Sequence, residues 1–165
     1  AGLALDERGA LLVDELLRTS DPAIYAAGDI ASWPDPTFQK RLRLEHWDVA
    51  RQQGLRAGRN MAGESKPYTA VPYFYSDLLG TALEVWGDLS SWDQVVLRGT
   101  LEGEHFSLFY FAQGLLTAAL AGNPTDEERK QMPALVRTRG PYGEIAGRLR
   151  DPGADLQALL PAQPA

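Results

Sequence analysis

Short apolar runs alternate with turn residues in the first forty residues of the chain. The runs at residues 11–13 and 23–27 are bounded by Gly, Asp, Ser and Pro, a pattern that is typical of short strands. The segment 31–44 follows them and contains Pro34 and Pro36. Because proline removes a backbone donor and interrupts a helix, we expect this segment to be a loop.

A helix is predicted from about Glu45 to Met61. Small and apolar residues recur there at three- and four-residue spacings, which places them on one face. Two of them are glycines, and each glycine inside a helix costs about 1 kcal/mol relative to alanine. We therefore expect this face to pack closely against a neighbouring element or a cofactor. The face consists of Trp47, Ala50, Gly54, Ala57, Gly58 and Met61.

Beyond residue 66 the pattern changes to short runs rich in aromatic and branched residues, which is typical of strands. Polar and glycine-containing turns separate the runs. Their partial alternation predicts an antiparallel meander of about five strands, with one packed face and one partly wet face. The runs are residues 73–76, 82–86, 94–99, 106–111 and 115–120.

A helix of about three turns is predicted to close this sheet. Thr125-Asp126-Glu127-Glu128 form a capping box ahead of Met132, Leu135 and Val136. One more short helix is expected near Asp155 to Leu160. The terminal Pro-Ala-Gln-Pro-Ala is expected to be disordered.

These patterns predict an α+β chain in two parts. Residues 1–66 are expected to contain strands and one long helix. Residues 67–165 are expected to form the antiparallel sheet, its flanking helices and the disordered tail. The segment GESKPYTAVP, residues 63–72, is the natural boundary between them.

Composition narrows the classes of function. The 165 residues carry a formal net charge of -6 without a lysine- or arginine-rich block, which argues against nucleic acid or an anionic membrane as a partner. The chain has no cysteine, which excludes disulfides, thiolate nucleophiles and iron–sulfur ligation by its own residues. No apolar run reaches the ~20 residues that span a bilayer, and no signal peptide is recognisable. We expect a cytoplasmic protein.

The sequence offers no metal site and no hydrolase triad. His46 and His105 are far apart, and no carboxylate cluster has the spacing of metal ligands. Ser20, Ser76 and Ser107 lack the glycine context of a nucleophilic serine. We assign no catalytic residue, and we expect His105 in a hairpin turn.

The stretch TSDPAIYAAGD, residues 19–29, ends an apolar run abruptly in Gly28 and Asp29. Glycine lets a ligand approach the backbone, and the carboxylate offers it an acceptor. The carboxyl ends of strands are also where ligands lie in open α/β sheets. A bare Gly-Asp pair more often forms an ordinary turn, so it is the longer string that favours a ligand site.

Two further segments carry candidate chemistry. Glu45, His46 and Trp47 stand at the start of the predicted helix, where free amides create a positive potential. The alternative for this segment is a core tryptophan with a histidine at its rim. In VPYFYSDLLG, aromatic residues ending in Tyr75 precede Ser-Asp, and the default interpretation there is a half-buried strand that enters a turn.

Together, YAAGD, EHW and FYSD resemble the FAD-dependent pyridine nucleotide-disulfide oxidoreductases, in their ferredoxin-reductase and apoptosis-inducing-factor-like branch. The resemblance spans almost the whole chain. It implies that residues 1–66 are the last part of the FAD-binding domain, and that residues 67–165 are the C-terminal reductase domain, a dimerisation or interface domain. The chain lacks GxGxxG. We therefore expect a C-terminal fragment that is inactive and colourless alone.

The resemblance also implies roles for the candidate residues. Asp29 would bind the ribityl chain of FAD, and Gly28 would give it clearance. The EHW helix start would face the pyrimidine edge of the flavin. Tyr75 stands where the family carries tryptophan in FWSD, near the nicotinamide side. This difference leaves the identity of the electron acceptor open.

The function implied for the complete protein is electron transfer from NAD(P)H through FAD to a ferredoxin-like or Rieske-type acceptor. A homodimer is one further option. The alternative is a non-catalytic dimerisation or partner-docking module that retains a vestigial flavin motif. The preference between NADH and NADPH is not readable, because the segment that determines it is missing from the chain.

Overall fold

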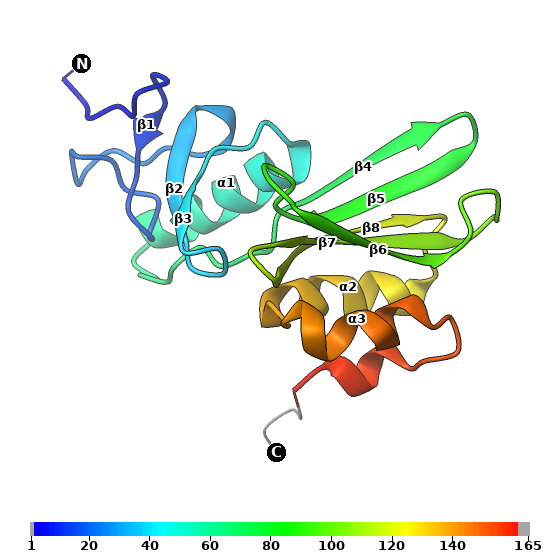
Figure 1. Ribbon diagram of the computed structural model, residues 1–165. Coiled ribbons are helices and arrows are strands. Elements are labelled where there is room, and N and C mark those ends of the chain that lie inside the picture. The colour runs from blue at the N-terminus through cyan, green and yellow to red at the C-terminus, as the bar shows by residue number, and fades with distance from the viewer. Residues whose placement is uncertain (1, 162–165) are drawn as a thin grey trace. The chain divides into compact units, whose positions relative to one another are not determined.

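The computed structural model describes residues 2–161 (Figure 1). These residues form two compact units, divided between Ala70 and Val71. Their regular structure consists of three α-helices, a three-stranded sheet and a five-stranded sheet, which confirms the expected α+β class. The boundary expected between residues 66 and 67 stays a prediction. Among residues 2–161, no helix combines the length and the apolar character needed to cross a bilayer.

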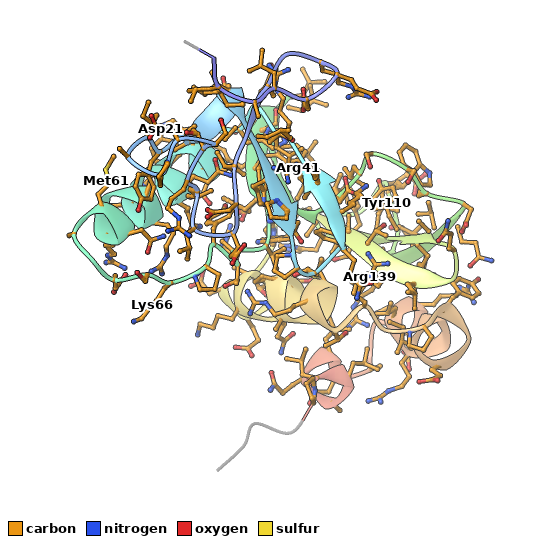
Figure 2. All side chains as sticks on the ribbon, turned by 90° about the vertical axis from the view of Figure 1, so that its left-hand side faces the viewer. Asp21, Arg41, Met61, Lys66, Tyr110 and Arg139 are labelled. Carbon is orange, nitrogen blue, oxygen red and sulfur yellow. The ribbon has the colours of Figure 1, made fainter. Side chains whose placement is uncertain are left out.

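The first unit contains the three-stranded sheet, a short 3₁₀ helix and one long helix. Its strands lie in the order β1-β2-β3, with β1 parallel and β3 antiparallel to the central β2. The side chain of Arg41 on β3 donates to the carbonyl oxygens of Ser32 and Val13, so it ties the strands together (Figure 2). The elements are β1 (Leu11–Leu12), η1 (Gly28–Ile30), β2 (Ala31–Asp35), β3 (Lys40–Leu42) and α1 (Trp47–Met61).

The strand positions in this unit correct two expectations. Residues 23–27 form no strand, because only Tyr25 makes an isolated bridge, to Arg18, before the chain enters η1. The segment expected to be a loop instead contains the β2–β3 hairpin. Pro34 is tolerated in β2 because β1 pairs only with Ala31 and Ser32, so at Pro34 the strand has a neighbour on one side only.

Helix α1 confirms the predicted helix, but its buried face is not the predicted one. The buried residues are Val49, Gln53, Ala57 and Asn60. Of the predicted face only Ala57 is buried, and a Cβ added at Gly54 or Gly58 would meet no described atom within 4 Å. Polar residues determine the orientation, because the side chains of Gln53 and Asn60 bond to backbone groups of distant loops.

The second unit is built on an antiparallel sheet with the strand order β4-β5-β8-β7-β6. Its strands confirm the predicted runs and their antiparallel pairing. The predicted meander is wrong, because β5 pairs with β8 and not with the next strand along the chain, β6. Two helices cover one face of this sheet, α2 against β5 and β8 and α3 against β6 (Figure 1). The strands are β4 (Tyr73–Leu78), β5 (Thr81–Gly87), β6 (Gln94–Gly99), β7 (Phe106–Ala112) and β8 (Leu115–Gly122); α2 (Asp126–Thr138), α3 (Tyr142–Arg150) and η2 (Leu156–Leu159) follow.

Helix α2 begins at the predicted capping box. The Thr125 hydroxyl accepts from the Glu128 amide at 3.2 Å, and the Thr125 amide donates to the Glu128 carboxylate at 2.8 Å. Met132, Leu135 and Val136 are buried, as their spacing predicted. The capping box determines where the helix begins, and its buried side chains pack it against the sheet.

The C-terminal region differs in part from expectation. Helix α3 was not predicted; it buries Ile145, Ala146 and Leu149 although it contains Gly143 and Gly147. The short helix expected near Asp155 to Leu160 is the 3₁₀ helix η2. The predicted terminal disorder concerns residues 161–165, of which 162–165 lie outside the described part of the chain.

Candidate functional site

Gly28 is buried where η1 meets α1. Its φ angle is +76°, and a Cβ at this position would lie 3.1 Å from the Cβ of Ala50. The Gly28 amide donates to the Oε1 atom of Gln53 at 2.8 Å. Glycine is therefore required here by the left-handed backbone and by the close approach of α1.

Asp29 follows Gly28 in η1, and its side chain is exposed. Its carbonyl oxygen accepts a hydrogen bond from Nε of Arg43 at 2.8 Å. The same guanidinium pairs with the Glu45 carboxylate at 3.1 Å. Arg43 thus connects the turn that carries Asp29 to the segment that leads into α1.

The start of α1 leaves its first amides without a cap from the N-cap side chain. His46 is the N-cap residue, and within residues 2–161 its side chain makes no capping hydrogen bond. Amides at such an end carry a partial positive charge that favours an anionic group. Trp47 is 70% exposed, with the Arg51 guanidinium 5.8 Å from its ring centroid. The alternative of a core tryptophan is therefore wrong.

The first unit brings most of the predicted site residues together. Gly28 and Asp29 lie in η1, which packs against α1, and the EHW segment forms the start of that helix. Tyr75 lies in the second unit, on the edge strand β4, and is 65% exposed. Its ring lies 6.3 Å from that of Tyr73.

Two residues of this arrangement were missed by the sequence analysis. Arg43 stands just before the EHW segment and offers no motif of its own. Gln53 could have been found, because it lies four residues from both Val49 and Ala57, which are buried. A polar residue in the middle of an apolar helical stripe is expected to have a specific hydrogen-bond partner.

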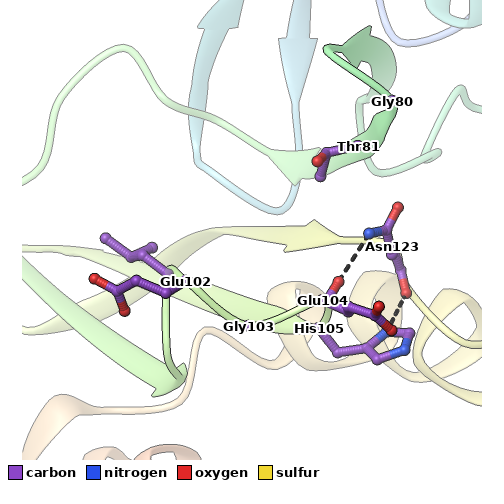
Figure 3. A pocket seen from close by; sticks show the side chains of 8 residues that line it. Gly80, Thr81, Glu102, Gly103, Glu104, His105 and Asn123 are labelled. Carbon is purple, nitrogen blue, oxygen red and sulfur yellow. Dashed lines mark hydrogen bonds between the residues drawn. The ribbon is translucent and has the colours of Figure 1, made fainter.

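A separate pocket lies at one end of the second unit's sheet (Figure 3). His105 lines it from the loop between β6 and β7, which confirms its predicted hairpin position. Asn123 contacts two residues that line the pocket. Its side-chain amide donates to the Glu104 carbonyl at 2.8 Å, and its backbone carbonyl oxygen lies 2.7 Å from Nδ1 of His105. None of the predicted site residues lines this pocket.

Comparison with known families gives two matches along the chain. The family described as pyridine nucleotide-disulphide oxidoreductase matches residues 1–54. The family described as reductase C-terminal matches residues 73–160. The two matches follow each other in the order of the two structural units.

Individual relatives are longer than this chain. Apoptosis-inducing factor 3 of Homo sapiens is 32% identical over 111 residues, which cover 67% of this chain and 18% of the relative. The biphenyl dioxygenase system ferredoxin-NAD(+) reductase component of Paraburkholderia xenovorans is 33% identical over 165 residues, covering 99% of this chain and 39% of the relative. The chain therefore spans less than half of either protein.

Solved structures include a similar fold. The crystal structure of the covalent putidaredoxin reductase-putidaredoxin complex contains a chain with a TM-score of 0.84 and 27% identity. The similarity covers 99% of this chain and 39% of that chain.

Proposed function

This chain belongs to the pyridine nucleotide-disulphide oxidoreductases that carry a reductase C-terminal domain, and on that premise we propose that it is the C-terminal part of a FAD-dependent NAD(P)H oxidoreductase. In the complete protein, electrons pass from NAD(P)H through FAD to a small iron–sulfur protein of ferredoxin or Rieske type. The name of one relative, a ferredoxin-NAD(+) reductase component, supports the pairing of a nicotinamide with a ferredoxin, and the putidaredoxin reductase of the similar solved structure supports reduction of the small protein. The observation that carries the proposal is the junction of η1 with α1, which places the Gly28–Asp29 turn against the helix.

The residues at this junction fit a flavin dinucleotide. Gly28 has no side chain that would hold a ligand away from the backbone of the turn. The exposed Asp29 carboxylate is an acceptor suited to the ribityl hydroxyls. Within residues 2–161 the N-cap side chain does not cap α1, and the positive potential of this helix start suits an electron-rich ring edge. Nε2 of Gln53 is a buried donor with no partner in the same residues.

Each residue has a distinct task in the proposed protein. The group that these residues would hold, FAD, would supply hydride acceptance and single-electron transfer. Asp29 holds the cofactor by accepting hydrogen bonds, and the amides at the start of α1 favour negative charge beside them. Tyr75 is assigned to the nicotinamide side of the flavin. Because the chain has no GxGxxG, binding of the pyrophosphate groups belongs to other segments of the proposed protein.

The absorbance spectrum of the purified full-length protein tests this proposal. We expect flavin absorbance that is bleached by NAD(P)H and restored by an added oxidised ferredoxin. A preparation that folds but neither contains nor takes up FAD would overturn the proposal. It would favour a docking module with a vestigial motif.

A further inference from the structure

Gln53 occupies an unusual place for a glutamine. It is 0% exposed and lies in the middle of α1, between the buried residues Val49 and Ala57. Burial of an amide is unfavourable unless its polar atoms are hydrogen-bonded, whereas an apolar side chain of similar size could fill the same space at no such cost. The position therefore calls for an explanation beyond packing.

The acceptor atom of Gln53 is used by the proposed cofactor turn. Oε1 of Gln53 accepts from the Gly28 amide at 2.8 Å, across 25 positions of sequence. On the other side of the turn, the Asp29 carbonyl is held by Arg43 at 2.8 Å. The backbone that carries the Asp29 side chain is thus fixed at the preceding amide and at its own carbonyl.

The donor atom of Gln53 contributes no hydrogen bond to the described fold. Nε2 is buried and has no hydrogen-bond partner in residues 2–161. A buried donor without a partner destabilises the fold by about 1–3 kcal/mol. Methionine would remove this unpaired donor but would leave the buried Gly28 amide without its acceptor, so the bond to Gly28 is the reason for an amide at this position.

We propose that Gln53 is a positioning residue, which holds the Gly28–Asp29 turn in the conformation that presents the Asp29 carboxylate to FAD. This inference rests on the proposed function. Gln53 acts through the turn, so its contribution to FAD affinity depends on the presence of Asp29.

The test compares FAD affinities in the full-length protein. Gln53→Met removes the acceptor and keeps a similar side-chain volume. Gln52→Met is the matched control, because the neighbouring Gln52 donates to the Asp48 carboxylate within its own helix, at 2.8 Å. The dissociation constant is obtained from the quenching of FAD fluorescence as apoprotein is added. Each substitution is measured alone and combined with Asp29→Ala, and circular dichroism verifies that each apoprotein is folded.

We expect Gln53→Met to weaken FAD binding about tenfold or more, and Gln52→Met to leave it within about twofold. In the Asp29→Ala background the effect of Gln53→Met is expected to shrink to about twofold, because the group that it positions is absent. If Gln53→Met does not fold, Gln53→Asn replaces it, since the shorter amide cannot reach Gly28.

Two results would overturn the inference while leaving the proposed function intact. One is a Gln53→Met affinity equal to that of Gln52→Met. The other is an equal loss with and without Asp29, which would mean that Gln53 acts only on general stability. A wild-type apoprotein that fails to bind FAD would instead overturn the proposed function itself.

Discussion

Backbone conformation and packing both require glycine at position 28. We predict that Gly28→Ala destabilises the protein by about 1–2 kcal/mol or more, because alanine is strained at positive φ. Its methyl group would also lie 3.1 Å from the Cβ of Ala50. Urea unfolding measures the change. Adding Ala50→Gly relieves the crowding but not the backbone strain, so the double variant is expected to recover only part of the loss. A Gly28→Ala protein as stable as the wild type would contradict the requirement for glycine at this position.

A second residue-scale prediction concerns alkaline pH. Burial raises the pKa of Tyr68 above its ordinary value of 10.0, and the charges of Asp48 and Asp35 add to the effect. The folded state therefore favours the neutral phenol. This contribution to stability is fully present below pH 10.0 and is lost as the pH rises above that value, where the unfolded chain releases the proton more readily.

The direction of this pH dependence is tested by measuring the free energy of unfolding at pH values below and above the ordinary tyrosine pKa. Tyr68→Phe cannot ionise, so we expect its stability to fall less steeply in alkali than that of the wild type. Tyr68 packs edge-on against Trp33, with 5.8 Å between the ring centroids, and phenylalanine preserves this contact. Equal alkaline slopes for the two proteins would refute the prediction.

At the scale of elements, regular patterns were readable from the sequence and context-dependent ones were not. The strands of the second unit and the capping box of α2 follow from local residue types, and the structure confirms them. The β2–β3 hairpin was missed because Pro34 is acceptable only where β1 has already ended. Helix α3 was missed because its glycines favour a turn, whereas burial of Ile145 and Leu149 stabilises the helix.

The candidate site shows the same division. The YAAGD and EHW motifs were visible in the sequence, and the structure brings them together. The roles of Gln53 and Arg43 were not visible, because each bonds to a backbone group 25 or 14 positions away. The orientation of α1 depends on such bonds. A pattern that counts only small and apolar residues therefore predicted the wrong face.

The cap of α2 gives an element-scale prediction. Thr125→Ala removes the hydroxyl that accepts from Glu128 and is expected to destabilise the protein by about 1 kcal/mol. Thr138→Ala is the control, because that hydroxyl donates to the Leu135 carbonyl within the same helix. It is expected to change the stability by less than about 0.5 kcal/mol. Urea unfolding compares the two variants, and an equal loss in both would argue against a specific capping effect.

At the scale of the whole molecule, the connection between the units begins as part of the first one. The side chain of Asn60 donates to the Lys66 carbonyl and accepts from its amide, both at 2.9 Å. The Tyr68 amide donates to the Glu15 carbonyl at 2.8 Å. The chain is therefore bound to the first unit as far as Tyr68, and only residues 69–70 remain before the second unit begins.

The last prediction separates the roles of the two units in the proposed complete protein. Asp29→Ala removes an acceptor from buried ribityl hydroxyls, and leaving such groups unsatisfied costs about 1–3 kcal/mol. We expect FAD affinity to fall roughly tenfold or more, since about 1.4 kcal/mol corresponds to a factor of ten. Tyr75→Ala is expected to leave FAD bound and to change the rate or the coupling of NAD(P)H oxidation, because Tyr75 lies on β4, outside the unit that holds the anchor.

Fluorescence of released flavin measures the first effect, and NAD(P)H consumption per acceptor reduced measures the second. The two variants serve as controls for each other. Both remove an exposed side chain, but only Asp29 is proposed to bind the ribityl chain of FAD. Unchanged FAD affinity in Asp29→Ala would show that the cofactor is bound elsewhere in the fold. Loss of FAD from Tyr75→Ala would mean that the second unit contributes to the anchor as well.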